Sequence, residues 1–457
     1  MTSTLDARRW QERLDEAARR HQVPGAALAV LAGGEVAEAA TGVVNKNTAV
    51  ETTTDSVFQI GSITKVYTAT LVMQLVEQGQ LELDAPVVEV LPELALADAG
   101  AAKAVTMRHL LTHTSGIQGD HFVETGRGDD ALERYVETCA ELDLSHPVGA
   151  TMSYCNTGFN LAGRVVERLT GTTWDRALRE RLVEPLGLTY TVTLPEEALA
   201  FRAAFGHVAE KGEEPHLGPV WGLPRSCGPA GLICARPADV VAFARMHLAG
   251  GVAPDGTRLL SEASAAAMQE PQVEMPDKHT LGSHWGLGWI LFDWDGRRVF
   301  GHDGNTIGQA AFLRIVPDAG VAVCLLTNGG HARDLYEQLY SELLGELAHL
   351  EMPAPLAPPD PPVTVDVAPY AGLYERVGTR IEMVVEDGVL HATLTSTGPL
   401  AALAEEPVHE VSLVPVSERL FVTRIEDEET WTPVTFYELE DGAPYVHLGA
   451  RATPKVA

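Results

Sequence analysis

The stretch FQIGSITKVYTATLVMQLVEQGQLELDAPV, residues 58–87, places a serine and a lysine three positions apart at the start of a predicted long helix. Ser62 and Lys65 share one face of such a helix, because side chains three positions apart are neighbours there. A serine nucleophile needs a base within reach, and a helix N-terminus offers free N–H groups to developing negative charge. The pair alone fits equally a serine N-cap followed by a solvated lysine, so other segments must separate the two interpretations.

A second candidate segment is SYCNTGFNLAG, residues 153–163, just before another predicted helix. Tyr154 and Asn156 are two positions apart in an extended segment, so their side chains point the same way. Tyrosine serves as a base only where neighbouring cations stabilise its phenolate, and Lys65 could supply that charge. Taken alone, Tyr154 fits equally a half-buried packing residue with a solvated hydroxyl.

The third candidate segment is VFGHDGNTIGQAAFLRIVP, residues 299–317. His302 lies where a strand begins, and the flanking glycines allow close approach of a substrate backbone. The histidine could donate a hydrogen bond or supply positive charge beside a serine–tyrosine pair. In isolation it fits an ordinary strand-edge histidine.

The order of predicted elements indicates an α/β (α+β) fold. GAALAVLAGG and EVAEAATGVV, residues 25–44, read as two strands joined at Gly33-Gly34. Further strands are predicted between residues 284 and 329, and a final helix at residues 332–350. We expect the first and last strands to share one antiparallel sheet, with the helix-rich middle as a second lobe and a cleft between them.

The C-terminal part differs in composition. MPAPLAPPDPPVTVDV, residues 352–367, contains six prolines and predicts a stiff extended linker. After it, TRIEMVVEDGVLHATLTS alternates about Asp387-Gly388, which is a strong hairpin signal, and the later segments continue in the same way. The predicted domains are therefore 1–351, a linker at 352–367, and a small antiparallel β-barrel at 368–457.

Composition limits the partners and the compartment. A net charge of -30 disfavours nucleic acid and anionic membranes, because long-range repulsion opposes both. The N-terminus lacks the pattern of a secretory signal, and the five cysteines include no CxxC pair. These features predict reduced thiols and a cytoplasmic protein.

Together, S-x-x-K, Y-x-N and H-x-G in this order resemble the serine β-lactamase and penicillin-binding-protein superfamily, closest to its class C and peptidase or esterase branch. LLTHTSGI, residues 110–117, also looks like that family, and the resemblance covers about residues 10–345. It implies a covalent acyl-enzyme mechanism without cofactor or metal. In that mechanism Ser62 attacks a carbonyl, and Lys65 and Tyr154 together move its proton.

The resemblance also implies roles around this pair. Asn156 would bind the substrate amide or orient Lys65, and His302 would hold the position of the lysine in the K-T-G version of the third motif. Backbone N–H groups of Ser62 and Asn305 would form the oxyanion hole. Gly304 and Trp221, the latter within WGLPRSCGPAGL, are predicted to contact substrate, although a surface loop is an equally good interpretation of the Trp221 segment.

The appended β-domain is similar to that of penicillin-binding-protein-type thioesterases, which carry a lipocalin-like C-terminal domain. This implies release and macrocyclisation of a nonribosomal peptide from its thioester, with a synthetase carrier protein as a further partner. An intracellular D-aminopeptidase, D-stereospecific amidase or esterase of the same fold is the alternative. A β-lactamase and a non-catalytic scaffold are weaker candidates, the scaffold because Ser62, Lys65, Tyr154 and His302 are all present.

Four further residues invite functional interpretation. His109 and His113 have metal-ligand spacing, but the glutamate of a zinc helix is missing, so a turn is expected. Cys155 should point away from Tyr154 and be structurally buried. Arg451, near the C-terminus, is expected to be solvated.

Overall fold

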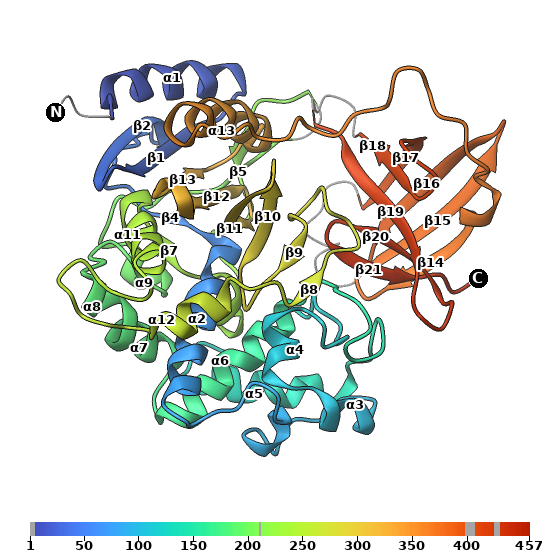
Figure 1. Ribbon diagram of the computed structural model, residues 1–457, viewed down its shortest axis with the longest axis horizontal. Coiled ribbons are helices and arrows are strands. Elements are labelled where there is room, and N and C mark those ends of the chain that lie inside the picture. The colour runs from blue at the N-terminus through green and yellow to red at the C-terminus, as the bar shows by residue number, and fades with distance from the viewer. Residues whose placement is uncertain (1–4, 210–211, 398–406, 425–429) are drawn as a thin grey trace.

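The computed structural model describes residues 5–209, 212–397, 407–424 and 430–457 of the chain. Figure 1 shows a large unit, in which helices cover a sheet, and a smaller all-β unit at the C-terminal end. The described strands form one nine-stranded sheet, one eight-stranded sheet and two short two-stranded sheets. The predicted β-domain at 368–457 includes positions 398–406 and 425–429, which lie outside the described residues.

The nine-stranded sheet is antiparallel and has both faces covered. Its strand β1 is buried at every position. Leu28 packs in the cluster formed with α1 (Ala7–Arg20) and α13 (Ala332–Ala348), whereas Ala29 packs toward the helical lobe. This explains why β1 reads as a continuous apolar run rather than an alternating one. In sheet order the strands are β3 (Val50–Glu51), β2 (Glu35–Asn45), β1 (Gly25–Ala32), β13 (Val321–Thr327), β12 (Gln309–Val316), β11 (Arg297–Thr306), β10 (Ile290–Trp294), β9 (His284–Trp285) and β8 (Val273–Glu274).

The helical lobe is built around α2 (Thr64–Glu77), which is buried from Thr64 to Leu75. A helix buried on all sides lies inside its domain, and Figure 1 shows α2 between the sheet and the other helices. None of the described helices is both long and apolar enough to cross a lipid bilayer. The other helices are α3 (Ala99–Ala104), α4 (Met107–Leu111), α5 (Ala131–Thr138), α6 (Asn156–Thr170), α7 (Trp174–Leu178), α8 (Glu184–Leu186), α9 (Pro195–Ala198), α10 (Gly228–Gly231), α11 (Pro237–Leu248) and α12 (Glu262–Met268). The short strands are β4 (Phe58–Gln59) with β7 (Cys234–Ala235), and β5 (His207–Val208) with β6 (His216–Leu217).

Strand β11 changes neighbours halfway along its length. It pairs with β12 from Phe300 to Thr306, but with β10 only from Arg297 to Gly301. The second half of β11 therefore has an edge that β10 does not cover. A short 3-10 turn, Gly61–Ile63, packs against this edge and leads into α2.

The C-terminal unit is a nearly closed antiparallel barrel. A bridge between Tyr374 and Lys455 joins its first strand to the chain end. Side chains such as Phe421 and Phe436 fill its interior. Its strands are β14 (Gly372–Arg376), β15 (Thr379–Glu386), β16 (Val389–Ser396), β17 (Val408–Pro415), β18 (Leu420–Thr423), β19 (Thr432–Glu438), β20 (Pro444–Leu448) and β21 (Arg451–Pro454). The predicted fold class, an α/β (α+β) domain followed by a small all-β domain, is confirmed.

Beside the nucleophile, the barrel lies against the extended chain before α6. The Tyr154 backbone N–H donates to the Ala450 carbonyl at 2.9 Å, and the Ala452 N–H donates to the Ser153 hydroxyl at 3.2 Å. The Tyr445 hydroxyl donates to the Ser145 carbonyl at 3.1 Å. The turn between β20 and β21 is therefore held beside the Y-x-N motif.

Candidate active site

Ser62 lies in the 3-10 turn Gly61–Ile63 rather than at the N-cap of α2, which begins at Thr64. Neither that turn nor α2 has a side-chain cap, so the interpretation of Ser62 as a helix cap is wrong. The tighter turn leaves the hydroxyl free to accept a hydrogen bond from Lys65 Nζ, at 3.0 Å. The prediction that Ser62 and Lys65 lie side by side agrees with this geometry.

Lys65 is fully buried and held at three points. Besides Ser62, its ammonium donates to Asn156 Oδ1 and to the Ala230 carbonyl, each at 2.7 Å. Burial, followed by the positive charge of Arg451, lowers the pKa of Lys65 to about 7. Near neutral pH a large share of this amine is therefore uncharged and able to accept a proton.

Tyr154 is buried against the same lysine. Lys65 Nζ lies 4.8 Å from the centre of its ring, and the Arg451 guanidinium lies 5.4 Å from it. His113 stacks on the ring with centroids 4.3 Å apart. Burial raises the pKa of Tyr154 well above its usual value, an effect that the Ser62 side chain opposes. Its hydroxyl is therefore protonated at neutral pH rather than a standing phenolate.

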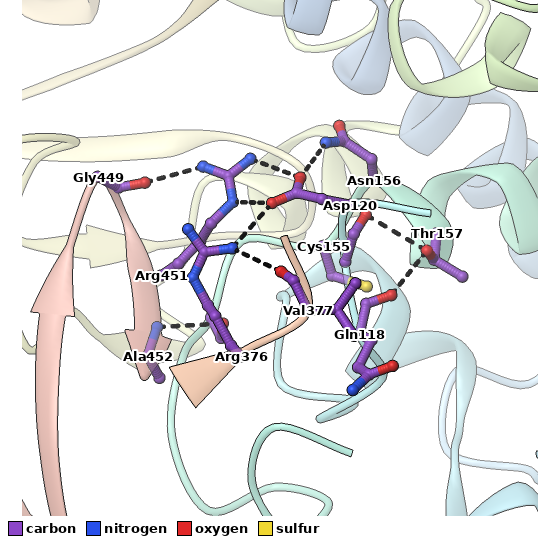
Figure 2. A network of polar contacts seen from close by, with 12 residues as sticks. Gln118, Asp120, Cys155, Asn156, Thr157, Arg376, Val377, Gly449, Arg451 and Ala452 are labelled. Atoms are coloured by element: carbon purple, nitrogen blue, oxygen red, sulfur yellow. Dashed lines mark hydrogen bonds and ion pairs between the residues drawn. The ribbon is translucent and has the colours of Figure 1, made fainter. Parts of the chain in front are cut away.

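Asn156 links Lys65 to the barrel, and Figure 2 shows the Asn156 side chain beside Asp120, which contacts Arg376 and Arg451. Its Nδ2 donates to Asp120 Oδ1 at 3.2 Å. Asp120 in turn accepts two hydrogen bonds from Arg451, at 2.6 and 2.8 Å, and one from Arg376 at 3.3 Å. Burial pushes the pKa of Asp120 up, but the two guanidinium groups outweigh it and hold that pKa below its usual range.

Arg451 is thus part of the site, and the expectation that it is solvated is wrong. Its guanidinium forms a bidentate ion pair with Asp120, 331 positions earlier in the chain. The pair forms because the β20–β21 turn docks beside Tyr154. We name the residues Asp120, Asn156, Arg376 and Arg451 the cross-domain cluster.

The third motif, His302-Asp303-Gly304, contacts the Ser62 turn through backbone atoms and not through charged side chains. A Cβ placed on Gly304 would lie 3.0 Å from the Ser62 nitrogen, and one placed on Gly61 would lie 2.7 Å from the Asn305 nitrogen. The two predicted oxyanion amides therefore belong to segments in direct contact. Glycine at both positions permits this approach, because any side chain would push the segments apart.

His302 lies beside Tyr154, with ring centroids 6.4 Å apart. Its Nδ1 bonds the Asp303 carbonyl at 2.6 Å, which makes Nδ1 the protonated nitrogen. Burial, followed by the charge of Lys65, lowers the pKa of His302 to about 3. The suggestion that His302 supplies positive charge is therefore wrong, and its buried Nε2 is an acceptor, with no partner among the described residues.

Behind this motif lies a buried ion pair. Asp303 binds Arg314, with Nη2 to Oδ2 at 3.2 Å, and Arg333 approaches the same carboxylate at 3.4 Å. Burial pushes the pKa of Asp303 up, but Arg314 outweighs it and holds that pKa below its usual range. We name Asp303, Arg314 and Arg333 the rear cluster.

The other singled-out residues have supporting positions. The Trp221 indole donates to the Ala204 carbonyl at 2.9 Å, and its own carbonyl accepts from Gln59, just before the nucleophile turn. The same segment contains Ala230, whose carbonyl accepts a hydrogen bond from Lys65. Sequence reasoning missed this contact because a backbone oxygen has no signature in the residue types.

The histidine pair and Cys155 are structural. His113 Nδ1 accepts from the Cys155 N–H at 2.9 Å, and His109 Nδ1 accepts from the Thr106 N–H at 3.2 Å. The Cys155 side chain accepts from the Gly158 N–H at the start of α6, as its predicted structural burial implies. Within the described part of the chain, no group of three potential metal ligands occurs.

The comparisons with known proteins agree with this arrangement. The family model described as Beta-lactamase matches residues 9–345. Penicillin-binding protein 4 of Amycolatopsis lactamdurans is 54% identical over 376 residues, covering 82% of this chain and 99% of that protein. An unguisins hydrolase of Aspergillus campestris is 25% identical over 93% of this chain and 86% of its own length.

Among solved structures, SurE is similar along nearly the whole chain. It is 28% identical with a TM-score of 0.78, covering 98% of this chain and 99% of SurE. The structure of SurE with D-Leu gives a TM-score of 0.76. From the family match, the identity to the penicillin-binding protein and the nucleophile geometry, the chain belongs to the β-lactamase and penicillin-binding-protein superfamily of serine hydrolases.

Proposed function

We propose that this protein is a serine acyltransferase that takes a peptidyl group from a thioester onto Ser62 and releases it as a macrocycle. The observation that carries the acyl-transfer step is Lys65 Nζ, 3.0 Å from Ser62 Oγ. Burial lowers the pKa of this lysine to about 7, so it accepts the serine proton at neutral pH.

In the acylation step, Ser62 Oγ attacks the thioester carbonyl carbon while Lys65 takes the hydroxyl proton. The C–S bond then breaks, and the proton passes to the leaving thiolate through the Tyr154 hydroxyl. Backbone N–H groups of Ser62 and Asn305 stabilise the oxyanion in both tetrahedral intermediates. In the release step, the amine of the peptide attacks the Ser62 ester, Lys65 takes the amine proton, and Ser62 Oγ regains a proton as it leaves.

The remaining predicted site residues have assisting roles in this proposal. Asn156 fixes the lysine through a 2.7 Å hydrogen bond, and neutral His302 offers one acceptor nitrogen beside Tyr154. Gly304 allows the third motif to lie directly against the backbone of the Ser62 turn, which keeps the two oxyanion amides together. The Trp221 carbonyl accepts a hydrogen bond from Gln59 and so supports the chain that leads to Ser62.

Two observations support release by an amine and a D-configured acyl residue. The β20–β21 turn covers the Y-x-N side of the site, which limits the access of water to the acyl-enzyme. SurE, similar over the whole chain, has been solved with D-Leu. A carrier protein of a nonribosomal peptide synthetase is the expected donor. All five cysteines are buried free thiols, which suits a cytoplasmic location.

Hydrolysis of peptides that contain D residues is the second candidate. The observations that favour it are the similarity to an unguisins hydrolase over most of both chains and to a D-stereospecific amidohydrolase of a Streptomyces species, which is 26% identical with a TM-score of 0.60. Cleavage of β-lactams has less support, since uncharged His302 replaces the lysine of the K-T-G motif. A non-catalytic scaffold has less still, because the nucleophile and its base are in contact.

The test uses a peptidyl thioester with a C-terminal D residue, its L epimer, and a simple D-aminoacyl amide. We expect an acyl adduct on the intact protein by mass spectrometry, lost in Ser62→Ala, and cyclic product from the D-terminal peptide. Linear acid as the sole product, with faster turnover of the amide, would establish the hydrolase instead. Absence of an adduct with any activated ester or thioester would contradict both.

A further inference from the structure

A cavity of about 820 Å³ lies on the face of β11 opposite the nucleophile. Along this part of the sheet, Leu313 faces the helical lobe, whereas Phe312 faces the layer of α13. The cavity lies on the Phe312 side and is partly open. It is lined mainly by the sheet with α13, the loop at 278–283, the linker at 352–356 and the barrel at 430–433.

The cavity adjoins the oxyanion hole through one residue. Asn305 is exposed and lines the cavity, while its backbone nitrogen lies against Gly61 in the turn that presents Ser62. A chain attached to Ser62 that follows the uncovered edge of β11 therefore reaches the cavity by passing Asn305 and Thr306.

The floor of the cavity is aromatic and rigid. Phe312 and Tyr336 stack with ring centroids 4.5 Å apart, and the Arg314 guanidinium lies 4.4 Å from the ring of Phe292. Arg314 is itself fixed by Asp303 in the rear cluster. Such a floor offers apolar contact without rearrangement, which favours ligands with apolar or aromatic side chains.

The rim carries charges of both signs. Arg333 and Lys278 lie on it together with Asp334, which accepts a hydrogen bond from the Thr430 hydroxyl at 2.5 Å. The barrel contributes Trp431, half-buried at the same rim. Mixed charge with an aromatic wall suits a peptide, which has polar main-chain groups and varied side chains, better than a single anion or cation.

We propose that this cavity binds the part of the peptidyl chain remote from the acyl bond. This inference rests on the proposed function, which it extends by assigning a binding site to the part of the peptide that takes no part in the acyl transfer. Ligand sites of 300–1,000 Å³ hold most of a drug-sized molecule, so this volume takes several residues of a folded-back peptide. Binding there holds the middle of the peptide while its amine returns to the Ser62 ester.

The test compares two cavity variants and one control in the full-length protein. Trp431→Ala removes the barrel wall, and Ala354→Trp adds bulk from the exposed linker position on the rim. Ala357→Trp places the same bulk three residues further on, at an exposed position that is not among the residues lining the cavity. Each protein is assayed with a cyclisable peptidyl thioester and with a single D-aminoacyl thioester.

We expect KM for the peptidyl thioester to rise about tenfold in both cavity variants, and KM for the aminoacyl thioester to stay unchanged. The Ala357→Trp control should behave like the natural protein with both substrates. Equal changes for the two substrates, or no change, would overturn the cavity proposal while leaving Ser62 acyl transfer intact. A natural protein that forms an adduct with neither thioester would overturn the proposed function and the cavity proposal together.

Discussion

Asp120 and Asp303 are each bound by two arginines, but the arginines come from different parts of the chain. Arg451 reaches Asp120 from the barrel, and its side chain is 24% exposed. Arg314 reaches Asp303 within one sheet, and its side chain is 1% exposed. The first ion pair joins two domains beside the nucleophile, whereas the second is sealed behind the third motif.

The two aspartate–arginine ion pairs therefore have different consequences for the protein. The charges of Arg451 and Asp120 act on Lys65 in opposite directions, the arginine lowering its pKa and the carboxylate raising it. The cross-domain cluster thus sets the proton affinity of the catalytic amine. The rear cluster faces away from the lysine, so its breakage should cost stability rather than change the chemistry. Four substitutions test this division.

Asp303→Asn is expected to have the largest effect. The change leaves Arg314 buried without a counter-ion, which destabilises the N-terminal domain by about 3–5 kcal/mol. Thermal and denaturant unfolding would measure this loss. Asp318→Asn is the matched control, since its partner Arg297 is held in an exposed pair at 2.8 Å and the expected loss is about 0–1 kcal/mol.

Asp303→Asn should also change how the free energy of unfolding depends on pH in the acidic range. Because the pKa of Asp303 is depressed in the folded state, its contribution is complete above the unfolded value near 3.8 and is lost as pH falls through the folded value. The natural protein should therefore lose stability below about pH 4, and Asp303→Asn should show a flatter dependence. A loss of stability independent of pH would mean that Asp303 is not ionised in the folded protein.

Arg451→Met is expected to lower kcat/KM at neutral pH by about tenfold or more. In the natural protein, activity should rise with pH through about 7, as Lys65 loses its proton. Removing the arginine charge raises the pKa of this lysine, so the rise of kcat/KM with pH moves to higher pH. Steady-state kinetics across the pH range would measure the shift. A purely structural role predicts a lower plateau with this rise unmoved.

Asp120→Asn should shift the pH dependence of kcat/KM in the direction opposite to that of Arg451→Met. Removing the carboxylate removes a charge that raises the pKa of Lys65, so the acidic limb of kcat/KM should move to lower pH. The plateau should also fall by about tenfold, since Asn156 loses a charged hydrogen-bond partner. Opposite shifts in Asp120→Asn and Arg451→Met are the signature of electrostatic control; shifts in the same direction would exclude it.

Features that depend on residues close together in the sequence could be predicted from it. The apolar run of β1 and the alternation after the linker predicted the two sheets, and the ordered motifs predicted which residues meet at Ser62. The contact between Asp120 and Arg451 has no local signal, because acidic and basic residues are common on surfaces and these two are 331 positions apart. The Ala230 carbonyl and the 3-10 turn at Ser62 are backbone features that tertiary packing decides.

Arg376→Met tests whether all barrel arginines matter equally, and we expect the smallest effect. Arg376 donates one 3.3 Å hydrogen bond to Asp120, whereas Arg451 donates two shorter ones. Burial lowers the pKa of Arg376 to about 10, so it is still charged at neutral pH. Asp120 also keeps its bidentate partner.

We therefore expect kcat/KM of Arg376→Met to stay within about threefold of the natural value, with the acidic limb unmoved. The measurement is the same pH series used for Arg451→Met. A shift as large as that of Arg451→Met would mean that the summed positive charge of the two arginines around Asp120, rather than the bidentate contact beside Tyr154, controls the pKa of the lysine. A small effect would mean that Arg451, in the β20–β21 turn, is the barrel residue that controls the pKa of Lys65. The barrel would then influence the chemistry at Ser62 through this turn.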